Sequence, residues 1–569
     1  MTVNEKELRQ KAKKQANAFL ENDSQYRMGY IAAEQPNPKT RNLSKVCGDD
    51  PAEGVKLLFS VDSEMAGRAE ATLGGNEFKT FADTVRSTIE NGGRVIFSGC
   101  GSTGRICMRL ESSWREAIDK FSNEKYLEYK ERIGYIQTGG DYAVIRAVES
   151  FEDSALLGRA QAMDWRLTEK DLLVGITATA ETTSILGTAV GALEQGANVY
   201  MLVCTDPLPL MEKMERVKEI YSHKNCRYLL LPCGPFAVTG SSRMQSSTFE
   251  QLCCAVALEG ALYDIMGKTD SFVGYRQMGE AFKNLTNQLL SKQTVSTVTS
   301  AVLKETEIYK NKGLITYFAD DCLLDVLTDT TERAPTFMTP PFCSSTMVGA
   351  EPSWAFVKNP SCSTADAWVK CFGREPRCME WEKERYISLG FSVEMADKIP
   401  DIGRSALLCF KIGNERDEKR ERAPSRALWV GRDEAPEAFA AQTAGYGSSG
   451  QLTIRQMGVS IAETYMDIFY HLCIKLTLNT LSTATMALMG RITGNWMTCL
   501  AMSNKKLIDR SARIVADVCG VSYEMALTEN FYSAALCEAN QINNSPAQET
   551  IKRLTKGEKY DKDSKRSKL

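Results

Sequence analysis

Histidine is nearly absent from this chain of 569 residues, which contains only His223 and His471. With only these two histidines, a His-rich metal site or a catalytic triad that uses histidine as its base is hard to build. We therefore expect no metal site. Any acid–base chemistry must use carboxylates or lysine.

Long apolar runs and a strong net charge are also missing. No run approaches the roughly 18 residues that a membrane-spanning helix needs, and the formal net charge is −3. Without a basic field, we expect neither nucleic acid nor a membrane as a partner. Any phosphate must therefore be bound by groups placed at one particular site, and not by an overall positive charge. The 18 cysteines have no paired CxxC spacing, so we interpret them as reduced and mostly buried.

Short apolar runs alternate with helical patterns along much of the chain. The first set of predicted strands lies at 94–99, 134–140, 171–177, 198–204 and 227–233. Strands separated by helices favour βαβ units and a parallel sheet with helices on both faces. Further strands are predicted at 313–320, 406–413 and 426–432. The repeated strand–turn–helix pattern indicates a duplicated α/β domain.

The chain is too long for one hydrophobic core, so we divide it into several units. Residues 1–50 are predicted to form an extended arm, followed by α/β domains over 51–285 and 286–465. Apolar residues then recur at three and four positions, which predicts a helical cap without strands over 466–545. Residues 546–569 are expected to be a mobile tail.

A glycine-rich turn, GCGSTGR at 99–105, directly follows the first strand and opens a helix. Glycines allow a tight turn, and a helix N-terminus offers free N–H donors to an anion. The spacing also fits a dinucleotide-binding loop. Against that alternative, Ser102 and Thr103 suit a phosphomonoester, and no acidic residue ends the next strand to hold a ribose. We expect no bound cofactor.

Two more strands run into polar turns that precede helices. One turn contains Thr177 and Thr179, and the other contains Ser242 and Arg243. Each turn alone is better explained as a helix cap. Because the carboxyl ends of parallel strands share one edge of the sheet, the three turns together favour an anion site.

At these turns the sequence resembles the SIS (sugar isomerase) family, in the branch of the N-acetylmuramate 6-phosphate etherases and the glucokinase regulatory protein. The matching segments are GGRVIFSGCGSTGR, TGGDYAVIRAVESFEDSALLG, TGSSRM, LNTLSTATMALMGRITGNWM and SNKKL, with PNPKTRNLSK in the arm. More than two hundred residues separate Gly240 from Leu478, and the second α/β domain lies between them. This two-domain layout is similar to that of the regulatory protein.

The resemblance implies a set of site residues in the first domain and the cap. The sugar-phosphate ligands it implies are Gly101, Ser102, Thr103, Thr177, Thr179, Ser242, Arg243 and, from the cap, Lys506. Glu152 matches one of the etherases' two functional glutamates. The position of the second functional glutamate is occupied by Ser113 in the first domain. In the second domain the matching position is Glu332, so the resemblance implies that Glu332 supplies this carboxylate. Since the etherase dimers complete each site across their interface, Glu332 would reach the first domain's site. The second domain's own turn has lost its glycines, so one site is expected.

The resemblance leaves two functions open. We favour a phosphohexose-binding regulator, with a phosphorylated hexose or amino sugar as ligand and a sugar kinase as partner. The alternative is a lyase that releases lactate from a muramyl 6-phosphate, with Glu152 and Glu332 catalytic. An isomerase or a dinucleotide enzyme is a further alternative. The segment at 179–183 and Gln245 depart from the etherase pattern, which weakens the enzyme interpretation.

The last three residues are Ser567, Lys568 and Leu569. A C-terminal S-K-L is an address that the peroxisomal import receptor reads. We therefore expect a peroxisomal, glycosome-type location with that receptor as a partner, and a cytosolic location without the signal. A chance tripeptide is the alternative.

Overall fold

The structure is a computed structural model that describes residues 5–146, 151–343, 351–398, 403–415, 425–542 and 544–555. Its first domain contains a parallel sheet in the order β2-β1-β3-β4-β5. The strands are β1 (Val95–Gly99), β2 (Ile133–Gln137), β3 (Leu172–Thr177), β4 (Asn198–Val203) and β5 (Cys226–Leu230). β1, β2 and β3 are buried at every position, as apolar parallel strands with covered faces should be. All five predicted strands are confirmed.

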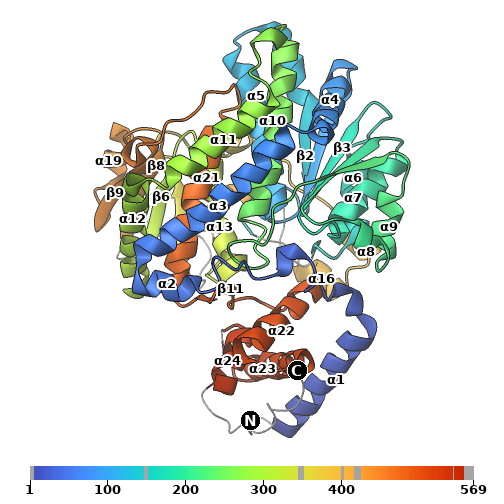
Figure 1. The fold of residues 1–569 in the computed structure, drawn as a ribbon, viewed down its shortest axis with the longest axis vertical. Helices are drawn as coiled ribbons and strands as arrows, with labels where there is room; N and C mark the ends of the chain where they lie inside the picture. The colour runs from blue at the N-terminus through green and yellow to red at the C-terminus, as the bar shows by residue number, and fades with distance from the viewer. Residues whose placement is uncertain are drawn as a thin grey trace.

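Helices surround this sheet (Figure 1). They are α3 (Pro51–Leu73), α4 (Asn76–Glu90), α5 (Ser102–Lys120), α6 (Ala155–Asp164), α7 (Thr183–Glu194), α8 (Leu208–Met211), α9 (Glu215–Tyr221) and α10 (Gln245–Ile265). Helices α6 and α9 pack on α7, and helices α4 and α5 pack on α10. This is the predicted α/β fold.

The second domain repeats the strand order with four parallel strands, β7-β6-β8-β9. They are β6 (Leu314–Phe318), β7 (Ala355–Lys358), β8 (Ser425–Gly431) and β9 (Ser448–Thr453). In each sheet, the strand that comes first in the sequence of that domain lies between the strands that come second and third. This shared order is what a duplicated domain would give. Helix α11 (Tyr275–Leu289) crosses the predicted domain boundary at 285 and packs on α3 of the first domain. The helices of the second domain are α12 (Lys292–Lys310), α13 (Leu323–Phe337), α14 (Thr364–Phe372), α15 (Lys383–Ser388), α16 (Val393–Lys398), α17 (Arg404–Leu408), α19 (Glu437–Thr443) and α20 (Ile454–Met457).

The predicted strand at 406–413 is wrong. Its first three residues lie in helix α17, because alanine and leucine favour a helix where no strand partner is available. The rest is held as a loop, where the carbonyl of Phe410 accepts a hydrogen bond from Trp368 Nε1 at 3.2 Å.

Helix α21 (Ile468–Leu488) belongs to the body of the molecule and is not part of a cap. Every residue from Ile468 to Ala487 is buried, and the helix packs on α3, α10, α12 and α13. A helix that is buried all round lies in a core. After it, the chain forms a hairpin, β10 (Ile492–Thr493) and β11 (Trp496–Met497), turned at Gly494 with φ +61°. The expectation of no strands here is therefore wrong.

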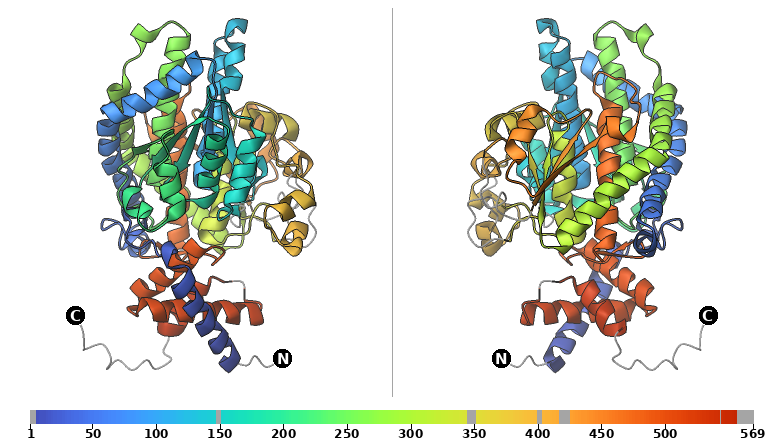
Figure 2. Two further views of the ribbon diagram at one scale, coloured as in Figure 1. Left: turned by 90° about the vertical axis from the view of Figure 1, so that its right-hand side faces the viewer. Right: turned by 90° about the vertical axis from the view of Figure 1, so that its left-hand side faces the viewer.

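The helical cap combines both ends of the chain. It contains α22 (Lys505–Cys519), α23 (Tyr523–Ala539), α24 (Pro546–Thr555) and, from the predicted arm, α1 (Glu5–Asn22), and it forms a lobe below the body in Figures 1 and 2. The first 50 residues are thus not simply an extended arm, since Ala16 and Phe19 of α1 pack against Ala512 and Leu527. A short helix, α2 (Leu43–Asp49), follows. The predicted tail begins with a helix, and its last residues, including Ser567 to Leu569, lie outside the described residues.

Candidate functional site

The glycine-rich turn between β1 and α5 is shaped by what its glycines permit. Gly101 has φ +57°, a conformation that residues with a Cβ rarely adopt. A Cβ on Gly104 would lie 1.3 Å from Oε1 of Gln137. Thr103 Oγ1 accepts a hydrogen bond from the N–H of Cys100 at 3.0 Å, which fixes the turn. The result is a helix N-terminus that opens toward the carboxyl edge of the sheet.

The hydroxyls of the three predicted turns lie close together. Thr177 and Thr182 share a hydrogen bond of 2.9 Å, and Thr179 donates one to Glu181 at 3.1 Å. Ser102 and Ser242, which are 140 positions apart, are joined at 2.7 Å. The turns therefore form one polar surface.

This surface is part of a single cavity that the cap and the second domain complete. All ten predicted site residues line it: Gly101, Ser102, Thr103, Glu152, Thr177, Thr179, Ser242, Arg243, Glu332 and Lys506. They come from four turns of the first domain, from α13 and from α22. The structure thus brings the whole predicted set together.

Lys506 lies between two carboxylates of the first domain. Its Nζ is 3.3 Å from Glu152 and 3.6 Å from Glu181, and the side-chain amide of Asn504 also donates to Glu152 at 3.2 Å. Burial alone would lower the pKa of Lys506, but the two carboxylates raise it above its ordinary value. The lysine therefore remains a cation at the cavity wall. Glu181, one of the departures from the etherase pattern, contributes directly to this arrangement.

Glu332 contrasts with Glu152. It is 6% exposed, and no described residue donates a hydrogen bond to it or forms an ion pair with it. Burial raises the pKa of this carboxyl, although Arg105, Arg243 and Lys475 oppose the shift. A buried acid without a partner is costly unless a ligand satisfies it. Glu332 lines the cavity, and its contact with a ligand remains a prediction.

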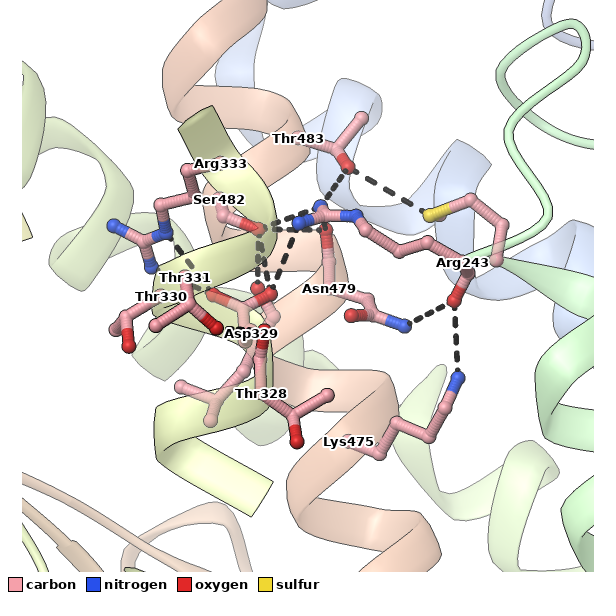
Figure 3. A network of polar contacts seen from close by, with 12 residues as sticks. Arg243, Thr328, Asp329, Thr330, Thr331, Arg333, Lys475, Asn479, Ser482 and Thr483 are labelled. Carbon is pink, nitrogen blue, oxygen red and sulfur yellow. Dashed lines mark hydrogen bonds and ion pairs between the residues drawn. The ribbon is translucent and has the colours of Figure 1, made fainter. Parts of the chain in front are cut away.

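Arg243 lines the cavity, but its guanidinium is largely engaged elsewhere (Figure 3). It contacts Asp329 of α13 at 3.3 Å and donates to Ser482 and Thr483 of α21 at 2.8 and 3.1 Å. The side chain thus connects a turn of the first domain to two helices outside it. Its Nε–H has no acceptor among the described residues. A direct contact between Arg243 and a ligand remains a prediction.

The prediction missed several residues of the cavity wall, among them Glu34 and Arg510. Glu34, in the arm, accepts hydrogen bonds from Arg510 of α22, at 3.0 Å from Nε, and from Arg513 at 2.6 Å. Burial would raise the pKa of Glu34, but the two guanidinium groups hold it well below its usual range. Both Glu34 and Arg510 line the cavity. Since 476 positions separate them, no local pattern could indicate this pair.

The corresponding turn of the second domain, between β6 and α13, is acidic. Asp320 accepts a hydrogen bond from Asn359 at 2.8 Å, and Asp321 accepts one from Tyr470 at 2.7 Å. Carboxylates at this position would repel an anion.

Within the part of the chain that the structure describes, no cluster of His, Cys, Asp and Glu could hold a metal ion, and no helix is long and apolar enough to cross a membrane.

Fold and cavity together define a protein with two parallel-sheet units of the sugar-isomerase type. The family model of the glucokinase regulatory protein N-terminal SIS domain matches residues 78–192. The N-acetylmuramic acid 6-phosphate etherase of Aliivibrio fischeri strain MJ11 is 30% identical over 233 residues, which are 41% of this chain and 69% of the relative. The enzyme of that name from Lactococcus lactis is 29% identical over 289 residues, 49% of this chain and 84% of the relative. The chain belongs to the SIS-domain family, in the branch that includes these etherases and the regulatory protein.

A solved structure, the tagatose-6-phosphate ketose/aldose isomerase of Escherichia coli, aligns with 78% of this chain and 94% of its own. The TM-score is 0.41 and the sequence identity is 9%.

Proposed function

We propose that the cavity binds a sugar 6-phosphate. The proposal is supported by the open N-terminus of α5, by the hydroxyls of Ser102 and Ser242, and by the partly buried cation of Lys506. Backbone N–H groups at a helix N-terminus suit a phosphate, and so does a fixed positive charge. The glutamates would then face the sugar ring.

We further propose that the chemistry at this site is that of an etherase-type lyase. The observation that carries it is the pair of carboxyls in different environments: Glu152 is paired with Lys506, whereas Glu332 is buried and has no hydrogen bond or ion pair with any residue that the structure describes. In the elimination, Glu152 takes the proton from C2 of the sugar and Glu332 donates a proton to the ether oxygen at C3. The C3–O bond breaks, a C2–C3 double bond forms and lactate leaves. Water then adds at C3. Two carboxyls whose environments differ can serve as base and acid.

The names of the curated relatives favour this lyase over the regulator that the sequence alone favoured. A second candidate, a regulator of a sugar kinase, has its own support. The matched family model is that of the regulatory protein's first SIS domain, and two such units share this chain. In addition, Gln245, where the etherases have lysine, is fully buried and donates to Asp62 at 2.7 Å. It therefore cannot reach a ligand.

The test is to incubate the protein with N-acetylmuramic acid 6-phosphate and to assay lactate. We expect release by the wild type, and a loss of about 10²–10⁴-fold in rate for Glu152→Gln or Glu332→Gln, because each removes a titrating proton. Phosphosugar affinity should stay within a few-fold of the wild type. The exposed Glu169→Gln serves as the control and should behave like the wild type.

Absence of lactate with intact binding would contradict the lyase and favour the regulator. If neither glutamine variant altered binding or turnover, the site across the two domains would be wrong.

A further inference from the structure

Two thiols lie almost within bonding distance at neighbouring strand ends of the first sheet. Cys204 directly follows β4, and Cys233 lies three residues beyond β5. The N–H of Leu231 donates to the carbonyl of Val203 at 2.7 Å, which keeps the two segments paired there. The Sγ atoms are 2.8 Å apart. Because a disulfide bond is about 2.05 Å long, about 0.8 Å of movement would join them.

A buried carboxyl lies next to this pair. Glu250 of α10 is fully buried, and its Oε1 accepts a hydrogen bond from Cys204 Sγ at 3.7 Å. Its Oε2 has no hydrogen-bond partner among the described residues. Burial raises the pKa of Glu250 to about 8 and that of the Cys204 thiol well above its ordinary value. From about pH 8 upward, where Glu250 is ionised, its carboxylate can take the thiol's proton, which the thiol itself releases poorly.

We propose that Cys204 and Cys233 are a redox-active pair that a hydroperoxide converts to a disulfide, with Glu250 as the base. Cys204 is the entry point because it is partly exposed, whereas Cys233 is only 1% exposed. The inference does not depend on the proposed function of the cavity.

The reaction has two balanced steps. The Cys204 proton passes to Glu250, the sulfur attacks one peroxide oxygen and the O–O bond breaks. The departing oxygen takes the proton back as an alcohol or water, and Cys204 is left as a sulfenic acid. The Cys233 sulfur then attacks Cys204, the S–O bond breaks and the hydroxyl leaves as water with the Cys233 proton. Two thiols are oxidised to one disulfide, and one hydroperoxide is reduced.

Several other titratable groups face Glu250 and bear on its pH dependence. They are Cys204, Cys233, Cys107 of α5, Cys253 and Cys254 of α10, and Lys475 of α21. Lys475 is the cation of this set. Its Nζ donates to the Arg243 carbonyl at 3.0 Å and to Thr248 at 2.8 Å, so its charge opposes but does not cancel the effect of burial on Glu250.

The first experiment treats the full-length protein with hydrogen peroxide, alkylates the remaining thiols and maps the peptides by mass spectrometry. We expect a disulfide between Cys204 and Cys233, and a higher melting temperature because the cross-link restricts the unfolded chain. Cys204→Ser and Cys233→Ser should lose the disulfide. Cys226→Ser, on the same sheet, should form it at the wild-type rate. Oxidation of other cysteines while both of these thiols remain alkylatable would overturn the proposal.

The second experiment tests the base. At about pH 8, where a large fraction of Glu250 is ionised, Glu250→Gln should form the disulfide about 10²-fold more slowly, and the rate should approach that of the wild type in strong alkali, where hydroxide removes the proton. A wild-type rate of the variant at about pH 8 would rule out Glu250 as the base. If Glu250→Gln does not fold, the rate of disulfide formation in the wild type, measured as a function of pH, tests whether Glu250 is the base. A rate that levels off above about pH 8 supports Glu250, whereas a tenfold rise per pH unit from about pH 6 to 10 contradicts it.

Discussion

Replacing Arg243 by alanine should destabilise the protein strongly, because the guanidinium connects the first domain to two helices outside it. Both Arg243 and Asp329 are buried, with side chains 3% and 2% exposed. Removing one partner of a buried ion pair costs about 3–5 kcal/mol. Asp329 would keep the guanidinium of Arg333, at 2.8 and 3.1 Å, and so would not be left uncompensated. We therefore expect the lower end of the range, about 3 kcal/mol.

The assay is urea-induced unfolding followed by tryptophan fluorescence. The control is Arg159→Ala, which breaks an exposed ion pair with Glu194 at 2.6 Å. An exposed pair contributes at most about 1 kcal/mol, so this control should change the free energy of unfolding little. If Arg243→Ala reduced the free energy of unfolding by no more than the control does, the role of Arg243 in connecting the first domain to α13 and α21 would be refuted. The main role of Arg243 would then be to bind a ligand.

Two further predictions concern a buried acid and the end of the chain. Burial raises the pKa of Asp62 to about 7, so the native state binds its proton more tightly than the unfolded chain does. The stability this gives is complete below about pH 4 and is lost as the pH rises to about 7. In Asp62→Asn, the midpoint of urea unfolding should fall less between about pH 4 and pH 7 than in the wild type, because asparagine does not titrate. An equal fall in both proteins would contradict the raised pKa of Asp62. We also propose that Ser567 to Leu569 direct the protein to peroxisomes, so a fluorescent fusion should enter them and its deletion variant should stay in the cytosol. An identical distribution of the two fusions would show that the tripeptide is incidental.

The first sheet could be predicted strand by strand because its inner strands are buried on both faces and read as uninterrupted apolar runs. The second sheet was harder. β7 has only four residues, and β9, with the sequence SSGQLT, is mostly polar. An apolar run is ambiguous between strand and helix, which is why the segment at 406–413 misled the prediction.

In the candidate site, too, some residues could be predicted from the sequence and others could not. The turns at Ser102, Thr177 and Ser242 carry local signals, since glycines and hydroxyls stand at strand-to-helix junctions. Glu332 could be placed only through the family resemblance. The ion pair of Glu34 and Arg510 could not be predicted, because it depends on how the arm packs on the cap. For α1 a signal was present, since Ala12, Ala16 and Phe19 recur at four and three positions and are buried.

Calorimetric titration with N-acetylmuramic acid 6-phosphate tests the central claim most directly. The account predicts saturable binding of one molecule per chain, with no binding of the unphosphorylated sugar. Gly101→Val should abolish it, because a β-branched residue is strained at φ +57° and would distort the turn at the N-terminus of α5. A folded Gly101→Val variant that binds like the wild type, a stoichiometry of two, or no binding by the wild type would contradict the account.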